Sequence, residues 1–188
     1  MKKTIATILL ILVGLALISC APAEKPLEIT PEEAKNVINS LLPDAVTVNE
    51  IFFGEGLKCE PPASDGAVFC PVTADCGFKT VDEIKALAEK VYSAGYLDSV
   101  YVSVFEGTKD DGEGIAVISP RYKVISGVLN VNITAKRYNI RTVTSVDNVE
   151  ITEKTPEYVK VTATADGEKM TFTLTKQAEK WLFAGPTY

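Results

Sequence analysis

Apolar residues in the first part of the chain recur every three to four positions, the spacing of one buried face of an α-helix. The clearest start is TPEE at 30–33, where a threonine cap, a proline in the first turn and a glutamate three residues after the cap form a capping box. The apolar positions that follow are Ala34, Val37, Ile38, Leu41 and Leu42. We expect this helix to end at Pro43, because proline lacks the backbone N–H that the next turn needs.

A second capping box, at residues 80–83, predicts another helix, which we expect Gly95 to terminate. Its apolar face consists of Ile84, Leu87, Ala88 and Val91. Apolar residues continue at helical spacing from 97 to 105 and predict a third, shorter helix, although residues 100–105 also favour a strand. The sequence thus predicts three helices ahead of residue 115.

Beyond residue 115 the period changes to two, the spacing of a β-strand with one face buried. Strands are predicted at 122–125, 128–133, 141–146, 149–153, 158–164, 170–175 and 181–183. The dipeptides Ser126-Gly127 and Asp166-Gly167 are typical of tight hairpin turns between such strands. Helices followed by antiparallel strands predict an α+β fold in which N-terminal helices pack on one face of a curved antiparallel sheet.

The N-terminus has the order of parts of a bacterial export signal: two lysines, an apolar run at 5–18 and a small residue, Ser19, before Cys20. The run is short for a permanent membrane span, which needs about 20 apolar residues. Residues 17–20, Leu-Ile-Ser-Cys, resemble the lipobox of bacterial lipoproteins. The resemblance implies that residues 1–19 are removed and that acyl chains on Cys20 hold the protein at the outer face of the cell membrane or at the outer membrane. An ordinary secreted protein and an uncleaved anchor are the alternatives.

The sequence therefore divides into a signal peptide at 1–19, a lipidated cysteine and tether at 20–29, and a single α+β domain at 30–188. The whole chain carries 19 basic and 25 acidic residues, and the loss of Lys2 and Lys3 with the signal peptide leaves 17 basic residues and a net charge of −8. An acidic surface is repelled by phosphate backbones and anionic headgroups. We therefore expect no nucleic-acid partner, and a membrane attachment that depends on the lipid alone.

Groups suited to catalysis are sparse in this sequence. The chain has no histidine, which excludes Ser-His-Asp and Cys-His arrangements and the usual catalytic zinc ligands, and it has no phosphate-binding glycine loop. Three carboxylates, Asp110, Asp111 and Glu113, lie close together, but their spacing is not that of an EF-hand, and a solvated connection is favoured over a calcium site. We expect a protein that binds without catalysing, and no metal or cofactor.

Three cysteines remain after the lipidated one: Cys59, Cys70 and Cys76. Export permits disulfides, and a Cys59–Cys70 bridge would close the base of the polar loop between them. A Cys70–Cys76 bridge competes with that pairing, and all three thiols can also stay reduced and buried. Adjacent prolines stiffen the loop, which we expect to project into solvent as a contact element for a protein partner. Its candidate contact residues are Pro61, Pro62 and Asp65.

The order of elements resembles two groups of exported bacterial domains. The matching stretches are 78–84 (FKTVDEI) at a helix start, 121–129 around the glycine hairpin, and 180–183 (KWLF) at the end. They are similar to small domains with the cone architecture of the nuclear-transport-factor-like superfamily and to IseA-type inhibitors of cell-wall DL-endopeptidases. The resemblance implies a cone-like α+β fold and carries over no catalytic residue.

Two functions follow as expectations. The first is a lipid-anchored binding protein of the cell envelope that holds a small ligand or a peptide on its concave sheet face, with Tyr122, Tyr138 and Trp181 as candidate liners. The alternative is an interaction protein that blocks a cell-wall peptidase, with the stiff loop between the first two of the three cysteines as its projecting element. Trp181 is also expected in the core, because apolar neighbours flank it in the last predicted strand.

Overall fold

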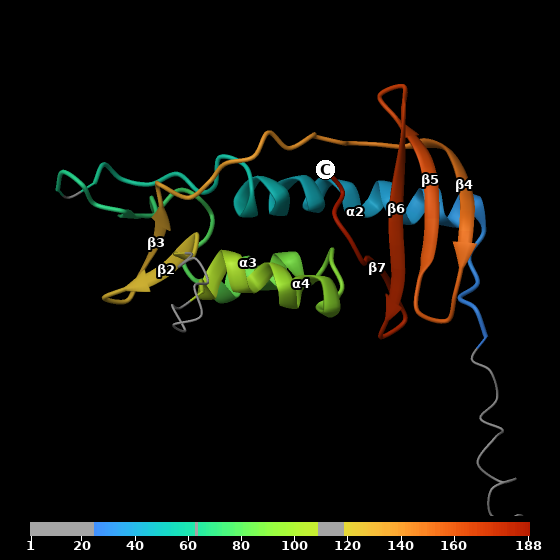
Figure 1. Ribbon diagram of the computed structural model, residues 1–188, viewed down its shortest axis with the longest axis horizontal. Helices are drawn as coiled ribbons and strands as arrows, with labels where there is room; N and C mark the ends of the chain where they lie inside the picture. Colours follow the sequence, from blue (N-terminus) through green and yellow to red (C-terminus); the bar gives the residue numbers. More distant parts are fainter. Residues whose placement is uncertain (1–24, 63, 109–118) are drawn as a thin grey trace, which may run out of the picture.

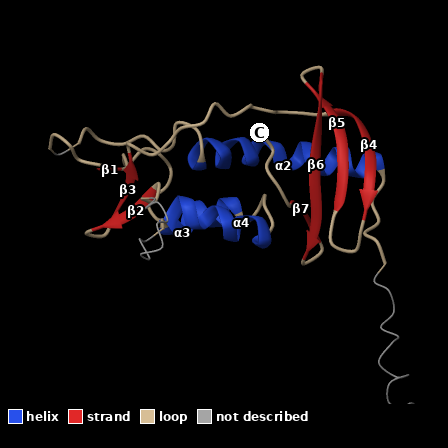
Figure 2. Ribbon diagram, in the orientation of Figure 1, coloured by secondary structure: helices blue, strands red, loops and turns tan. Residues whose placement is uncertain are grey.

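The computed structural model of the chain describes residues 25–62, 64–108 and 119–188. The molecule is elongated, with a three-stranded sheet at one end, a four-stranded sheet at the other and helices between them (Figures 1 and 2). Both sheets are antiparallel. The described ranges contain three α-helices besides these sheets, which confirms the predicted α+β class.

The first helix, α2 (Pro31–Phe52), begins as the capping box predicts. The Glu33 N–H donates to the Thr30 hydroxyl at 3.2 Å, and the Thr30 N–H donates to the Glu33 carboxylate at 2.8 Å. The prediction that Pro43 ends this helix is wrong. Pro43 lies on the exposed face, where water can bond the carbonyl that its missing N–H leaves free. The buried face meanwhile continues through Ala45, Val48, Ile51 and Phe52.

The second capping box opens α3 (Val81–Ala88), as predicted. The prediction that Gly95 terminates it is wrong, since Gly95 lies in the first turn of the next helix, α4 (Ala94–Tyr101). The reason is tertiary, because the segment between the two helices pairs with the last strand of the chain: Phe183 donates its N–H to the Val91 carbonyl at 2.9 Å.

The third predicted helix is present at 97–105. It consists of α4 and the π-helical turn η1 (Val102–Glu106) that extends it. The β-prone residues of this stretch therefore stay helical. Leu97, Val100 and Val104 form its buried face, so burial of a helical stripe outweighs local strand propensity here.

The four-stranded sheet is a meander of β4 (Asp147–Lys154), β5 (Val159–Ala165), β6 (Glu168–Gln177) and β7 (Lys180–Phe183). Burial alternates along β5, as the period of two predicts. The turn at Asp166-Gly167 has positive φ at both positions, 51° and 82°, as a tight hairpin turn requires. Local turn chemistry therefore sets the register of this sheet.

The three-stranded sheet has the order β1 (Phe69–Pro71), β3 (Val128–Asn132), β2 (Tyr122–Ile125). Its hairpin turns at Ser126-Gly127, again with positive φ at both residues. The inner face carries buried residues of all three strands, namely Cys70, Val131 and Tyr122, which are neighbours across the sheet.

Residues 133–146 link the two sheets by running beside α2 (Figure 1). The predicted strand at 141–146 is therefore wrong, and the strands form two sheets where one curved sheet was expected. The side chain of Asn39 on α2 takes the place of a neighbouring strand. The Val146 N–H donates to Asn39 Oδ1 at 2.7 Å, and Asn39 Nδ2 donates to the Val146 carbonyl at 3.2 Å.

One hydrophobic core contains residues from the helices and from both sheets. Its largest fully buried side chains include Tyr92, Tyr122, Phe172 and Phe183. The Tyr92 hydroxyl lies 2.8 Å from both Asn49 Oδ1 on α2 and Thr187 Oγ1 near the end of the chain. This buried polar contact ties the C-terminal segment to the long helix.

The described chain begins beside β4. Leu27 donates its N–H to the Thr155 carbonyl at 2.8 Å, and Glu28 forms an ion pair with Lys154 at 3.1 Å. The loop at 60–66 lies at the opposite end of the molecule (Figure 1). Across the three described ranges, no helix has both the length and the apolar character needed to cross a membrane.

Candidate binding site

A cavity of about 640 Å³ opens where the C-terminal end of α2 meets η1 and the segment that follows β3. Its volume lies within the range of about 300 to 1,000 Å³ that is usual for small-molecule sites. The wall combines aromatic rings with a few polar side chains, which is the composition of a recognition site.

The aromatic wall consists of Phe53, Tyr138 and Tyr188. The ring centroid of Phe53 lies 5.2 Å from that of Tyr188 and 6.4 Å from that of Tyr138. The Tyr138 N–H donates to the Phe53 carbonyl at 2.8 Å, so the segment after β3 is held against the end of α2. Tyr138 stays half exposed, at 50% of its surface, and is accessible from solvent.

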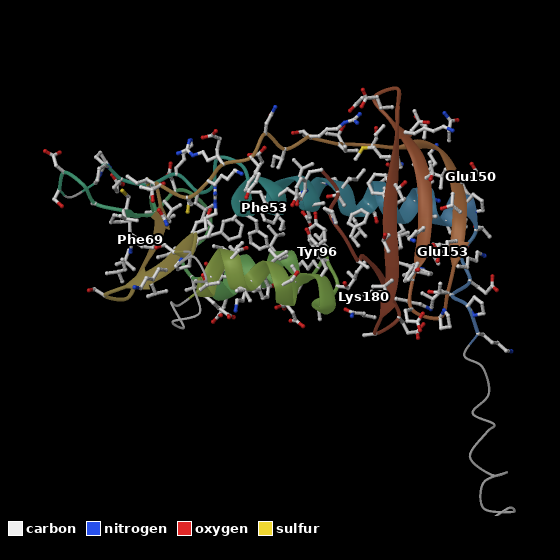
Figure 3. The ribbon with its side chains drawn as sticks, viewed as in Figure 1. Phe53, Phe69, Tyr96, Glu150, Glu153 and Lys180 are labelled. Carbon is white, nitrogen blue, oxygen red and sulfur yellow. The ribbon has the colours of Figure 1, made fainter. Side chains whose placement is uncertain are left out.

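Two tyrosines meet behind this wall. Tyr96 on α4 and Phe53 at the end of α2 are labelled on facing helices in Figure 3. Burial raises the pKa of Tyr96, and the Tyr188 hydroxyl, whose pKa burial also raises, is hydrogen-bonded to that of Tyr96. Both phenols are therefore neutral at physiological pH, and of the two only Tyr188 lines the cavity.

The polar wall centres on Arg121, which is only 5% exposed. Its Nη2 donates to the Gly54 carbonyl at 2.5 Å and its Nη1 donates to the Lys136 carbonyl at 3.3 Å, while Nε has no hydrogen-bond partner. Among the ion pairs of the described residues, none includes Arg121 or Lys136. Lys136 Nζ instead lies 4.7 Å from the ring centroid of Tyr138.

Asn132 closes the polar side. Its Oδ1 accepts hydrogen bonds from the Thr134 N–H at 2.9 Å and from the Thr134 hydroxyl at 2.7 Å, and its Nδ2 donates to the Pro120 carbonyl at 3.3 Å. This bonding fixes the backbone on both sides of the cavity. Hydroxyl, amide and cationic groups of this kind orient a ligand by hydrogen bonds and charge. The described ranges hold no cluster of three acidic or cysteine side chains placed to bind a metal ion.

The three predicted liners do not meet on one face. Tyr138 lines the cavity, but Tyr122 is completely buried, with its hydroxyl donating to the Ile51 carbonyl at 2.9 Å and accepting from the Leu57 N–H at 3.0 Å. Trp181 lies on β7 of the other sheet, half-buried against the core. Placing Tyr122 and Trp181 on a shared ligand face is therefore wrong, because the strands that carry them belong to separate sheets.

The loop between Cys59 and Cys70 has the exposure that its sequence predicts. Pro61, Pro62 and Asp65 are all exposed. At its base the Glu60 N–H donates to the Pro71 carbonyl at 2.8 Å, so the two sides pair as a hairpin. A role of these residues in contacting a partner stays a prediction.

The three described cysteines are free thiols. Burial and the neighbouring Cys70 thiol raise the pKa of Cys59, so these two side chains lie together as the first predicted pairing requires. The Cys76 thiol donates to the Phe78 carbonyl at 3.1 Å. Which disulfide forms on export stays a prediction. Cys20 and the carboxylates Asp110, Asp111 and Glu113 lie outside the described residues.

Sequence reasoning missed Arg121, Lys136, Phe53 and Tyr188. Arg121 belongs to the strand start that the sequence marked, but an arginine beside a strand ordinarily points to solvent. Only the burial of its guanidinium distinguishes it. In comparisons of the sequence, no protein-family model matches the chain and no curated protein is significantly similar to it. The functional argument therefore rests on the geometry of the cavity.

Proposed function

We propose that the chain is a lipid-anchored, non-catalytic binding protein of the bacterial cell envelope that holds a small ligand or the end of a peptide. The observation that carries this proposal is the cavity of about 640 Å³ between α2, η1 and the segment after β3. Aromatic rings on one side and fixed polar groups on the other are suited to hold a ligand of mixed character. The proposed binding site therefore lies at the end of α2, whereas the sequence predicted it on the face of the sheet.

The anchor is supported by the lipobox resemblance at residues 17–20 and by the position of the first described residues. These are fixed beside β4, so a lipid on Cys20 would hold the four-stranded sheet nearest the membrane. Cys20→Ser should release the protein from the membrane fraction and remove the mass of the lipid. A variant that stays membrane-bound with an unchanged mass contradicts a thiol-linked anchor.

The cavity is tested by filling it. Ser103 is exposed on η1 and lines the cavity, so Ser103→Trp should occupy the space without disturbing the core. The matched control is Ser99→Trp, an exposed position on α4 that does not line the cavity. Small molecules that co-purify with the full chain from the envelope, measured by mass spectrometry, should be lost from Ser103→Trp and kept by the control. Equal ligand content in both variants contradicts the proposed site.

A second function, an interaction protein that blocks a cell-wall peptidase, is favoured by a separate observation. Five exposed apolar side chains lie on the three-stranded sheet and at its margins. They are Val68, Val124, Ile125, Val128 and Ile133. Exposed apolar surface of this kind marks contact surfaces, and this end of the molecule lies opposite the first described residues.

The loop is tested by replacing residues 60–65 with a Gly-Ser linker that keeps both flanking cysteines. The control replaces the turn Ala178-Glu179, at the other sheet, with Asn-Gly. If the inhibitor function holds, the loop variant loses inhibition of envelope peptidase activity and the control keeps it. Full inhibition by the loop variant, or none by the native chain, contradicts this second function.

A further inference from the structure

Arg121 is a buried cation with unused donors. A guanidinium carries five N–H groups, and those of Arg121 bond the Gly54 and Lys136 carbonyls and the Tyr122 hydroxyl, with Nε unpartnered. All three partners are uncharged. An arginine that is buried almost completely is normally paired with a carboxylate, because removing its charge from water is costly.

The two described carboxylates nearest to Gly54 in the sequence are engaged elsewhere. Glu55 forms an ion pair with Arg137 at 2.5 Å, and the Glu50 side chain accepts a hydrogen bond from the Glu55 N–H at 3.3 Å. No described aspartate or glutamate lines the cavity, whereas Arg121 and Lys136 both do. The side chains that line the cavity thus include two basic and no acidic ones, in a chain whose net charge is −6.

The backbone at Gly54 and Gly56 holds the guanidinium of Arg121 in place. Gly56 has a φ of +79°, and a Cβ atom added there would lie 2.8 Å from Arg121 Nη2. Glycine therefore allows the turn after α2 to close over the guanidinium. The Gly54 carbonyl then fixes its orientation, which preorganises the site for an anion.

We propose that the cavity takes a ligand with a carboxylate joined to an aromatic or apolar body, and that Arg121 binds the carboxylate while Phe53, Tyr138 and Tyr188 hold the body. This inference rests on the proposed binding function and specifies its ligand class. Hydrogen bonds between a guanidinium and a carboxylate are stronger than those between neutral groups, and Lys136 adds a second, exposed charge to the lining. The same chemistry is offered by a free aromatic acid and by the C-terminal aromatic residue of a peptide.

The test compares acids with their uncharged amides on the full native chain, by titration calorimetry. The probes are 3-phenylpropionate against 3-phenylpropionamide, and N-acetyl-alanyl-phenylalanine against its C-terminal amide. We expect each preferred acid to bind at least about tenfold more tightly than its amide, with an affinity that falls as salt is raised. If 3-phenylpropionate binds more tightly than its amide, the ligand is a free acid. If the dipeptide acid binds more tightly than its amide and 3-phenylpropionate does not, the ligand is a peptide end.

Variants assign the effect to the cavity. Lys136→Gln should weaken the acid roughly threefold and leave the amide unchanged, while Arg137→Gln, which removes a neighbouring charge paired outside the cavity, should change neither. Arg121→Gln should remove the preference, and Arg121→Lys, which keeps the charge, should retain part of it. Because a variant of a buried arginine can fail to fold, the acid–amide comparison on the native chain is decisive.

Two further outcomes separate this inference from the proposed function. Equal affinity for acids and amides, abolished by Ser103→Trp, overturns the carboxylate inference and leaves a binding cavity. No binding of any probe tighter than roughly 1 mM overturns the carboxylate inference as well. Retention of native small molecules by Ser103→Trp would in addition overturn the cavity itself.

Discussion

The two ends of the molecule use their polar and apolar residues in opposite ways. In the four-stranded sheet, Val159, Val161 and Phe172 are fully buried, and charged residues such as Glu153 and Lys160 pair on the surface at 2.7 Å. Around the three-stranded sheet, valines and isoleucines are exposed, while Arg121, Asn130 and Asn132 are buried. Burying apolar side chains and exposing charged ones lowers the free energy of the folded state. Exposed apolar and buried polar side chains raise it, and binding of a ligand or partner would offset that increase.

This comparison assigns the parts different roles. We propose that the four-stranded sheet and the body of α2 form a scaffold, and that the region around the cavity and the three-stranded sheet supplies surfaces for recognition. Changes in the scaffold should alter the free energy of unfolding and leave binding intact, and changes at the cavity should do the reverse. Each prediction below tests that division.

The largest effect is expected from Phe172→Ala in β6. The side chain is fully buried, so the substitution should lower the free energy of unfolding by about 3 to 5 kcal/mol. Urea unfolding of the full chain measures the change, and the folded protein should keep its ligand affinity. A loss under about 1 kcal/mol would mean that this sheet is not the stabilising half.

The second effect depends on pH. Burial raises the pKa of Tyr92 from 10.0 to about 12, against the lowering effect of its hydrogen bonds to Thr187 and Asn49. The unfolded state then releases the phenolic proton at lower pH than the folded state does, so stability is full below pH 10 and falls as the pH rises towards 12. The loss from this group is roughly 2 to 3 kcal/mol.

The measurement for Tyr92 is the free energy of unfolding as a function of pH in the alkaline range. Tyr92→Phe starts from a lower stability, because it leaves Asn49 and Thr187 without that partner, but its stability should fall less steeply above pH 10. Parallel pH curves for the native chain and the variant would contradict the role of this phenol.

A smaller effect is expected for Trp181→Ala in β7. The ring is half-buried against the core, so the free energy of unfolding should fall by roughly 1 to 3 kcal/mol while ligand affinity stays unchanged. If the variant loses ligand binding while its free energy of unfolding is unchanged, Trp181 belongs to the binding site and the scaffold assignment is contradicted.

The smallest effect on stability is expected for Tyr138→Ala. The residue is half exposed, so the free energy of unfolding should change by no more than about 1 kcal/mol. Ligand affinity should fall about tenfold, because the ring forms a wall of the cavity. Tyr158→Ala, a partly exposed tyrosine on the scaffold, is the matched control and should leave affinity unchanged.

Features that depend on neighbouring residues were predictable from the sequence. The capping boxes at Thr30 and Thr80 and the hairpin turns at Ser126 and Asp166 satisfy their backbone groups within a few residues, so the sequence alone identifies them. The α+β class follows from the same local patterns.

Features that depend on distant partners were not predictable. The continuation of α2 past Pro43 depends on a buried face that extends to the end of the helix, and the backbone at Val146 bonds the side chain of Asn39 and no neighbouring strand. The cavity is assembled from segments far apart in the sequence. Neither the burial of Tyr122 nor the unpaired charge of Arg121 has a local signal.

The division between scaffold and recognition region is tested most directly by backbone amide chemical shifts of the full chain, recorded with and without small molecules extracted from the envelope. We predict that the shifted amides cluster at residues 52–53, 103–104, 119, 121, 132–138 and 188, and that β4 to β7 stay unchanged. Shifts concentrated in the four-stranded sheet, or confined to the loop at 60–66, would contradict the cavity as the binding site.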